Sequence, residues 1–255
     1  MNTALKSGIK KTLVSLGLEI RRIPKRRELS IPDPEFYAPL FSPWNGYGDF
    51  ARYLELAKPY TLVSPDRLYV LFSMAQNAIH LHGDFWECGV YRGGTARMLA
   101  EFLAQNARPE MKLHLFDTFE GMPDTDPEVD LHKKGDFSDT SLAAVKAVVG
   151  NLDRVDFWPG WIPETFRSMQ KARIALAHVD VDIYQSVWDC CEFIYPRLEP
   201  GGAMLFDDYG FPSCPGARKA VDDFFAEKPE APIVLPTGQA LAIRMAVGER
   251  QLVGA

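Results

Sequence analysis

Two short acidic motifs hold the residues whose types and spacing most directly indicate chemistry. Asp180 and Asp182 lie in HVDVDIY, and Asp207 and Asp208 lie in FDDYG, 27 and 28 residues after Asp180. Alternation along a strand would place Asp180 and Asp182 on the same side. Each motif ends a β-rich apolar run, and neighbouring parallel strands direct their carboxyl ends into one crevice. We therefore expect the four carboxylates to converge.

Converging carboxylates repel one another, so such a cluster requires protons or a cation. Oxygen ligands suit Mg²⁺ or Ca²⁺, and His178 is the only softer group close in sequence. A partial protein shell completed by water and substrate favours Mg²⁺. The alternative is that the aspartates are strand-end caps and surface charges.

A second motif, ECGVYRGGT, covers residues 87–95 where a predicted strand ends and a helix begins. Its glycines allow close approach of the backbone to a ligand, and a helix N-terminus favours a negative group. Tyr91 and Arg92 fill positions that a dinucleotide pyrophosphate needs kept small. The turn therefore indicates an amino-acid carboxylate, with which Arg92 could also pair. A purely structural turn remains the alternative.

Asp117 ends the next predicted strand, 23 residues beyond Gly94. An acidic residue there can accept hydrogen bonds from both ribose hydroxyls of an adenosine, although a helix cap is the alternative. The polar stretch that follows, to Ser141, is long for a connection and is expected to bind a ligand. Within it, Asp136 is a candidate acceptor for the adenine amino group. His132 is either a substrate contact or a solvated loop residue.

The elements that must position these motifs alternate between helix and strand from about residue 50. Apolar runs predict strands at 84–90, 112–119, 154–160, 174–182 and 202–209, and helical spacing predicts helices at 65–81, 95–107, 141–152, 186–198 and over GARKAVDDFF. Two short apolar runs around Pro236–Gln239 predict a hairpin. This pattern predicts an α/β class I methyltransferase fold, Rossmann-like, with a mostly parallel seven-stranded sheet and a C-terminal antiparallel hairpin.

Residues 1–49 differ from the rest and are predicted to be a separate N-terminal segment, followed by the enzyme domain at 50–255. Residues 1–27 are basic with helical apolar spacing, and residues 28–49 read as a proline-rich arm or lid. A helix packed on a neighbouring subunit is favoured over one docked on a membrane surface or another partner.

Composition indicates a globular enzyme. Apolar residues make up 47% of the 255-residue chain, and the formal charge of -6 argues against a nucleic-acid partner. Cys88, Cys190, Cys191 and Cys214 form no C-x-x-C pair, which indicates neither a zinc site nor a disulfide framework. No apolar run is long enough for a membrane span or a signal peptide. We therefore expect a cytoplasmic protein without integral membrane association.

The motifs ECGVYRGG, DTFEGMP, GDFS, HVDVDIYQS, LEPGGAMLFDDYG and RKAVDDF resemble those of the macrocin O-methyltransferase family, which methylates deoxysugar hydroxyls of antibiotics. The resemblance spans residues 60–245. It implies S-adenosylmethionine binding by Glu87, Gly89 and Asp117, magnesium ligation by Asp180, Asp207 and Asp208, and Asp180 as general base. It also implies that the N-terminal arm contributes to the substrate pocket and to contacts within a homo-oligomer. The predicted cofactor site is completed by Arg92, Gly94, Thr95, Thr118, Phe119, Asp136 and Phe137.

The predicted function is magnesium-dependent methyl transfer from S-adenosylmethionine to a hydroxyl of a small acceptor, a deoxysugar diol on a natural product. One rival is a glycosyltransferase in which VDVD acts as a metal-binding D-x-D motif. The glycine turn and the second aspartate pair argue against it. An aromatic diol acceptor and a non-catalytic scaffold that binds the cofactor alone are two further rivals. Trp44, Tyr47, Trp158 and Trp161 could stack on either kind of acceptor or belong to the core.

Overall fold

A mostly parallel sheet occupies the centre of the computed structural model, which describes residues 41–150 and 152–246. The strands lie in the order β3-β2-β1-β4-β5-β7-β6. The first five pair in parallel, and β7 pairs antiparallel with β5 and β6. Their bounds are β1 (Asp84–Cys88), β2 (Leu113–Asp117), β3 (Val155–Pro159), β4 (Ile174–Val179), β5 (Leu198–Phe206), β6 (Ile233–Val234) and β7 (Ala240–Ile243). The strand order reverses between β1 and β4, so the carboxyl ends of these strands define a crevice for ligands.

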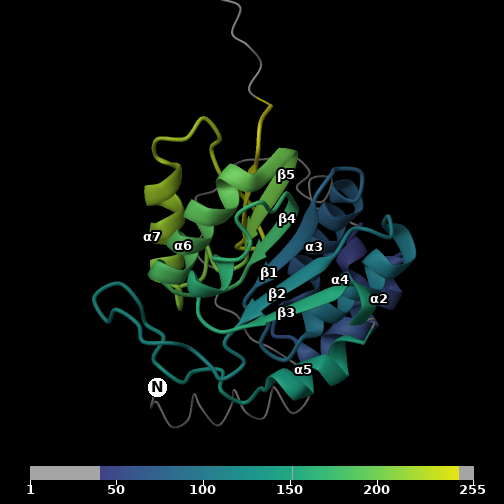
Figure 1. The fold of residues 1–255 in the computed structure, drawn as a ribbon, viewed down its shortest axis with the longest axis horizontal. Helices are drawn as coiled ribbons and strands as arrows, with labels where there is room; N and C mark the ends of the chain where they lie inside the picture. The colour runs from purple at the N-terminus through teal and green to yellow at the C-terminus, as the bar shows by residue number, and fades with distance from the viewer. Residues whose placement is uncertain (1–40, 151, 247–255) are drawn as a thin grey trace, which may run out of the picture. The chain divides into compact units, whose positions relative to one another are not determined.

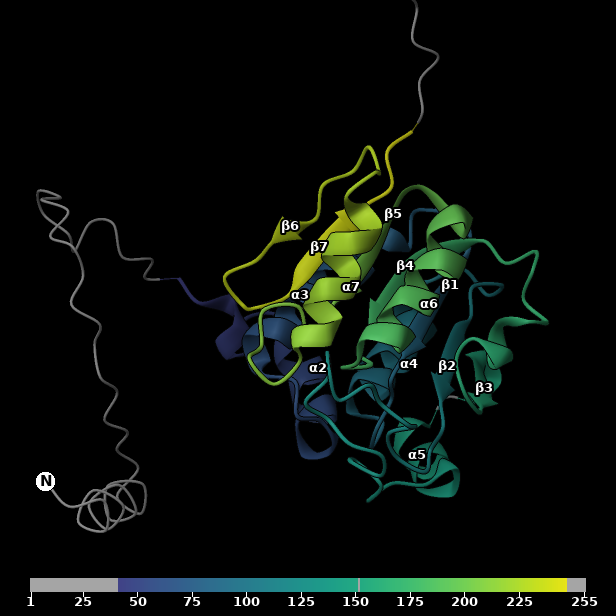
Figure 2. The same ribbon diagram turned by 90° about the vertical axis from the view of Figure 1, so that its left-hand side faces the viewer.

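Helices cover both faces of the sheet (Figure 1). One face carries α2 (Phe50–Ala57), α3 (Pro65–Ala78), α4 (Gly94–Asn106) and α5 (Leu142–Val149), and the other carries α6 (Tyr184–Ile194) and α7 (Pro215–Phe225). The view in Figure 2 shows α6 and α7 side by side in front of the strands. Short 3₁₀ turns occur at Pro43–Asn45, Lys58–Tyr60, Leu152–Arg154, Glu164–Phe166 and Tyr195–Arg197.

Alternation along the strands builds two hydrophobic cores. Phe85 of β1 packs with α2–α5, whereas its neighbour Trp86 packs with α6 and α7. Leu205 and Met204 of β5 divide in the same way. Successive side chains of a strand point to opposite faces, so a run of consecutive apolar residues is what a sheet covered on both sides requires. The predicted seven-stranded α/β architecture with its antiparallel C-terminal hairpin is confirmed.

Several details of the elements differ from the prediction. The strand expected at 174–182 ends at Val179, and Asp182 has a left-handed backbone with φ of 58°. Asp180 and Asp182 therefore follow the strand in a turn and do not alternate along it. Helix α2 was not among the predicted elements, and β5 begins at Leu198, earlier than expected. The basic helix predicted at 1–27 and most of the arm lie outside the described residues.

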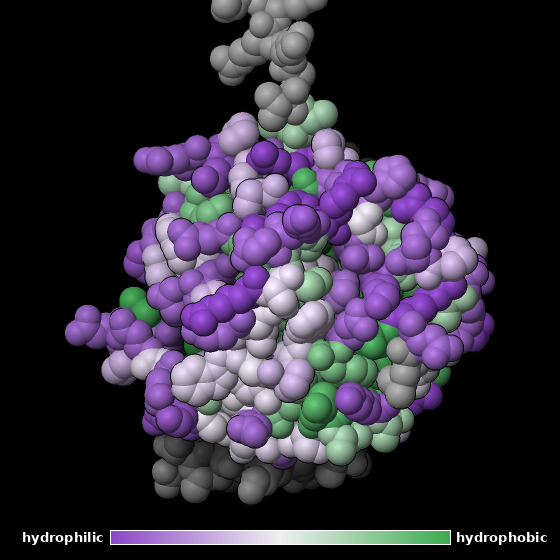
Figure 3. Space-filling view, viewed as in Figure 1, coloured by the Kyte–Doolittle hydropathy of each residue, from purple (hydrophilic) through white to green (hydrophobic). Residues whose placement is uncertain are grey.

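The surface in the view of Figure 3 is largely hydrophilic, with hydrophobic side chains gathered over α5 below the strands. Ala143, Ala144 and Ala147 are exposed on this helix, while Val145 and Val149 are buried against the core. Helix α5 therefore presents small apolar side chains outward. Among residues 41–150 and 152–246, no helix combines the length and apolar character needed to cross a bilayer.

Candidate active site

A cavity of about 440 Å³ opens at the carboxyl ends of the parallel strands. Its walls come from the turn between β1 and α4, the end of β2, the loop from Thr118 to Thr140, and the turns after β4 and β5. Thr61–Val63 and Arg67 close one side. Both chemical motifs of the sequence thus open into one space, as expected for the switch point of an open α/β sheet.

Gly89 brings the glycine turn into direct backbone contact with the end of β4. It has φ of 86°, and a Cβ there would lie 1.8 Å from the carbonyl oxygen of Asp180. Gly94, at the start of α4, is also closely packed, because a Cβ would lie 2.7 Å from the carbonyl oxygen of Ala57. These glycines therefore serve chain packing, and Gly89 also lines the cavity.

Asp117 organises the same turn. Its Oδ2 accepts hydrogen bonds from the backbone N–H groups of Val90 at 2.6 Å and Tyr91 at 3.1 Å, and its Oδ1 accepts one from Phe119 N–H at 2.6 Å. Asp117 and Thr118 line the cavity, and the Thr118 hydroxyl donates to the Gly121 carbonyl at 2.7 Å. A carboxylate has about four acceptor positions, so Asp117 retains limited capacity for a ribose hydroxyl.

Glu87 and His178 form a buried pair behind the cavity. Glu87 Oε1 lies 3.0 Å from His178 Nδ1, and both residues are fully buried. Burial by itself lowers the pKa of His178, but its hydrogen bonds to Asp207 and Glu87 and the charge of Asp180 outweigh burial and raise the pKa well above 6.5. Within the described part of the chain, Glu87 Oε2 has no hydrogen-bond partner. Neither Glu87 nor His178 is among the residues that line the cavity, so the contact of Glu87 with the cofactor stays a prediction.

Asp207 is fully buried and surrounded by donors. Arg67 donates to its Oδ2, the Gln239 amide donates to its Oδ1 at 2.8 Å, and His178 Nε2 lies 3.5 Å from that oxygen. Burial by itself raises the pKa of Asp207, but His178, Arg67 and Gln239 together hold it below its ordinary value. Arg67 and Gln239 were not predicted from the sequence, since neither belongs to an acidic or glycine-rich motif.

Asp180 and Asp208 both line the cavity, and the pKa of each carboxyl is raised. Burial and the charge of Asp207 raise the pKa of Asp180 well above its usual range. Burial, followed by the charges of Asp180, Asp182 and Asp207, does the same for Asp208. Ligand atoms of His178, Asp180 and Asp207 lie within 4.8 Å of one another. This group of one imidazole and two carboxylates could hold a divalent cation, which would offset the repulsion between the carboxylates; Asp208 is not part of the group.

Four non-glycine residues of the described chain have positive φ: Tyr91, Phe119, Phe137 and Asp182. Tyr91, Phe137 and Asp182 line the cavity, and Phe119 is buried beside it, two residues after Asp117. Left-handed backbone is uncommon for such residues and clusters at functional sites. Their concentration around one cavity supports a ligand-binding role for these loops.

The other predicted cofactor residues divide between the cavity and its margin. Thr95 and Phe137 line it. Arg92 is about half exposed and pairs with Asp139, and Asp136 Oδ2 lies 3.1 Å from His132 Nδ1. Arg92 and Asp136 thus have protein partners in place of the ligand groups expected for them.

The aromatic residues also divide. Trp161 is 55% exposed and lines the cavity. Trp158 stacks on Phe116 with a ring separation of 6.0 Å and donates to His114 Nδ1, so it is a partly buried residue that packs against the core. Trp44 packs against the core beside α2 and α3. Trp161 is therefore the tryptophan placed to meet a ligand.

The comparison with protein families agrees with this arrangement of motifs. Residues 56–234 match the model of the macrocin-O-methyltransferase family, TylF. The chain belongs to this family. The resemblance predicted from the sequence is thereby confirmed. Members of an O-methyltransferase family are S-adenosylmethionine-dependent enzymes, which agrees with the predicted enzyme class.

Curated relatives include sugar O-methyltransferases. The chain is 33% identical over 153 residues to 8-demethyl-8-(2,3-dimethoxy-alpha-L-rhamnosyl)-tetracenomycin-C 4'-O-methyltransferase of Streptomyces olivaceus, a match covering 56% of this chain and 58% of that relative. It is 31% identical to mycinamicin III 3''-O-methyltransferase of Micromonospora griseorubida, over 65% of this chain and 70% of that relative. The match to the first relative thus spans less than two thirds of its length.

Solved structures share the architecture. The O-methyltransferase NovP has a TM-score of 0.66 at 27% identity, covering 73% of this chain and 83% of NovP. The calicheamicin methyltransferase CalS11 has a TM-score of 0.64 at 18% identity, covering 95% and 94% of the two chains, and shows the common fold. The predicted class I methyltransferase fold is confirmed.

Proposed function

We propose that this protein transfers a methyl group from S-adenosylmethionine to a hydroxyl of a deoxysugar, with Mg²⁺ bound at the aspartates. One observation carries the proposal. The glycine turn with Asp117 and the carboxylates of Asp180 and Asp208 line a single cavity at the switch point of the sheet. Methyl transfer requires the donor and a nucleophilic oxygen side by side in such a space.

At the donor end, the turn at Gly89 and the N-terminus of α4 would receive the methionine part of the cofactor, because free N–H groups and the helix dipole favour its carboxylate. Asp117 would accept a ribose hydroxyl with its remaining capacity, and Glu87 Oε2 supplies a buried acceptor nearby. S-Adenosylmethionine supplies an electrophilic methyl group, so the protein has to align it and exclude water.

At the acceptor end, Asp180 is the group that we assign as general base. Burial and the charge of Asp207 raise its pKa, which makes its carboxylate a stronger proton acceptor than an exposed aspartate. Asp180, Asp207 and Asp208 would hold Mg²⁺, which supplies Lewis-acid stabilisation of the developing alkoxide. Arg67 offsets the charge of Asp207 and so keeps a buried carboxylate ionised beside the base.

A sugar diol is the acceptor class that we favour. The relatives named above include enzymes described by a rhamnosyl 4'-O position and by a mycinamicin 3''-O position. Trp161 is exposed on the cavity wall and could pack against a sugar face. An aromatic diol would use the same residues. Offering the enzyme a catechol and a methyl rhamnoside together, and measuring which of them is methylated, distinguishes the two acceptor classes.

Titration calorimetry tests the proposal. The full chain is titrated with S-adenosylmethionine and then with Mg²⁺, beside the variants Asp117→Ala and Asp208→Asn. We expect Asp117→Ala to lose S-adenosylmethionine binding and to retain Mg²⁺ binding. Asp208→Asn should lose Mg²⁺ binding and retain S-adenosylmethionine binding. Absence of S-adenosylmethionine binding to the unaltered protein under any metal condition would contradict the proposal, and nucleotide sugars would then test the glycosyltransferase function.

A further inference from the structure

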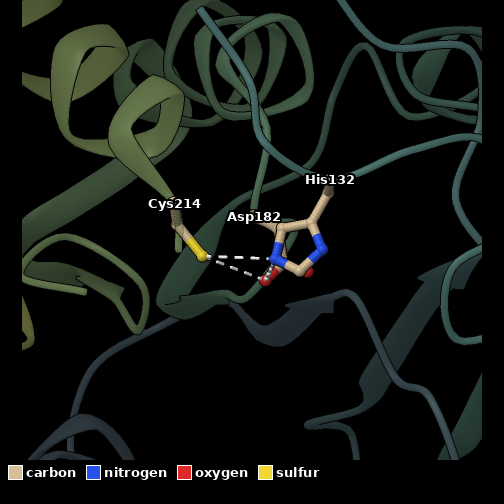
Figure 4. A group of neighbouring side chains, drawn as sticks. All are labelled: His132, Asp182 and Cys214. Carbon is tan, nitrogen blue, oxygen red and sulfur yellow. Dashed lines mark hydrogen bonds and ion pairs between the residues drawn. The ribbon is translucent and has the colours of Figure 1, made fainter. Parts of the chain in front are cut away.

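We propose that His132, Asp182 and Cys214 form a second metal site, for Zn²⁺ or a cation of similar preference, at the edge of the same cavity. The three side chains come from different segments and converge in Figure 4. His132 lies in the long loop after β2, Asp182 in the turn after β4, and Cys214 immediately before α7. This inference concerns a metal that the proposed methyl transfer does not require.

The spacing of the three ligand atoms fits one small cation. Cys214 Sγ lies 3.3 Å from Asp182 Oδ1 and 3.7 Å from His132 Nε2, and His132 Nε2 lies 3.6 Å from Asp182 Oδ1. With Zn–S of about 2.3 Å and Zn–N and Zn–O of about 2.0–2.2 Å, ligands of a tetrahedral zinc lie about 3.3–3.6 Å apart. The observed triangle is therefore close to one face of such a tetrahedron.

The imidazole is held in the orientation that a metal ligand needs. His132 Nδ1 lies 3.1 Å from Asp136 Oδ2, and that oxygen also accepts the backbone N–H of Lys133 at 3.0 Å. A carboxylate on one ring nitrogen fixes the tautomer and directs the other nitrogen to the metal. Asp136, predicted from the sequence as an adenine contact, is placed here to orient His132.

Asp182 is fixed by its backbone. Its φ is 58°, and its N–H donates to Asp208 Oδ2 at 3.0 Å. These constraints hold the Asp182 carboxylate beside the Cys214 thiol, and residue Cys214 is only 3% exposed. The hydrogen bond to Asp208 also places the proposed zinc site next to the aspartates assigned to magnesium.

The ligand types of the two proposed sites favour different metals. An imidazole, a thiolate and one carboxylate suit Zn²⁺ or Co²⁺, whereas a cluster of aspartates suits Mg²⁺. His132, Asp182 and Cys214 all line the cavity, so a fourth position faces its interior, as in zinc sites with three protein ligands. The fourth ligand would be water or a hydroxyl of a bound molecule. Cysteine spacing could not indicate this site, because its ligands come from three distant segments.

Cobalt titration of the full-length protein, freed of metal with a chelator, tests the site. With excess Mg²⁺ present to occupy the aspartates, we expect one Co²⁺ per chain, with a thiolate-to-cobalt charge-transfer band and the intense d–d absorption of a tetrahedral centre. Cys214→Ser should remove the charge-transfer band, whereas Asp208→Asn should retain it. The other described cysteines, Cys88, Cys190 and Cys191, are fully buried elsewhere and act as an internal control. Zn²⁺ should displace the cobalt signal, and excess Mg²⁺ should not.

A second pair of variants covers the case in which Cys214→Ser fails to fold. His132→Ala should abolish the cobalt spectrum, and Asp136→Asn should weaken cobalt affinity about 10- to 100-fold. An unaltered protein that shows no thiolate band, or a band that survives both Cys214→Ser and His132→Ala, would overturn the proposal. The three residues would then be a hydrogen-bonded group only. S-Adenosylmethionine binding, measured on the same samples, reports separately on the proposed methyltransferase function.

Discussion

Asp207 is the residue at which the acidic site depends most on the rest of the protein. Arg67 and Gln239 reach it from the start of α3 and from the hairpin before β7, and His178 reaches it from β4. A buried carboxylate without such partners would take up a proton or destabilise the fold. The partners of Asp207 therefore keep this buried carboxylate ionised behind the cavity.

Arg67→Met is expected to lower the free energy of unfolding by about 3–5 kcal/mol, because it leaves a buried charge without its cation. The Arg67 side chain is 13% exposed and that of Asp207 is fully buried, so solvent screens the pair little. Urea unfolding without added divalent cations measures the change. The double variant Arg67→Met with Asp207→Asn should recover part of the loss. If Arg67→Met lowered the free energy of unfolding by less than about 1 kcal/mol, the Arg67–Asp207 ion pair would contribute no more than a solvent-exposed pair does.

Asp180→Asn is expected to lower kcat by about 10²- to 10⁴-fold, because it removes the assigned proton acceptor. The Kd for S-adenosylmethionine should stay unchanged. Steady-state methylation of a rhamnoside with free vicinal hydroxyls and calorimetry measure the two quantities. Glu164→Gln, at a half-exposed carboxylate away from the cavity, is the matched control. Full activity of Asp180→Asn would show that another group takes the proton.

Convergence of the aspartates was predictable from the sequence, because each motif directly follows an apolar run and parallel strands end at one edge. The partners of Asp207 were not predictable. Arg67 and Gln239 lie far from Asp207 in sequence, and only tertiary packing brings them to it. The same holds for Cys214, which a search for paired cysteines treats as a plain buried thiol.

At the scale of elements, Glu230 links the segment after β7 to the 3₁₀ turn that follows α6. Its carboxylate accepts the Tyr195 hydroxyl and the backbone N–H of Met245, and Arg244 lies 3.6 Å away. Burial by itself raises the pKa of Glu230, but the Tyr195 and Met245 hydrogen bonds and Arg244 lower it overall. A depressed folded-state pKa means that this group stabilises the fold above its unfolded pKa, about 4.3.

Glu230→Gln is expected to destabilise the protein at neutral pH and to have progressively less effect as the pH falls through the folded-state pKa of Glu230. The reason is that the native carboxylate itself becomes protonated there and loses its advantage. Urea unfolding of both proteins from pH 7 to pH 3 measures the difference. A difference that stays constant over this range would show that the glutamate acts through packing alone.

Buried parallel strands were the easiest elements to predict, since continuous apolar runs mark them. Their ends were harder. The end of β4 was misplaced because Val181 continues its apolar pattern, although the chain turns at Asp182. The start of β5 was obscured by Pro200, Gly201 and Gly202. A register shift between Ile174 and Leu176 accommodates that start in the sheet. Helix α2 was missed because it directly follows a proline-rich segment, which obscured its start.

For the whole molecule, the two ends of the cavity should stabilise the fold separately. S-Adenosylmethionine at 100 times its Kd is worth about 2.7 kcal/mol, which corresponds to a Tm increase of about 5–10 °C for a domain of this size. Differential scanning calorimetry measures it. Asp117→Ala should lose the cofactor-dependent increase and keep the Mg²⁺-dependent one. A loss of both increases would mean that the variant has disturbed the entire cavity.

The contact between Gly89 and the carbonyl of Asp180 has a consequence for engineering. Because two backbones meet there, the separation of the donor turn from the base is set by the sheet and not by side-chain rotamers. Substitutions that seek a new acceptor by widening this contact would damage the scaffold first. Acceptor range is better altered at Trp161 and Leu62, whose exposed side chains border the cavity from the loop side. Design libraries directed to those walls would leave the reaction distance intact.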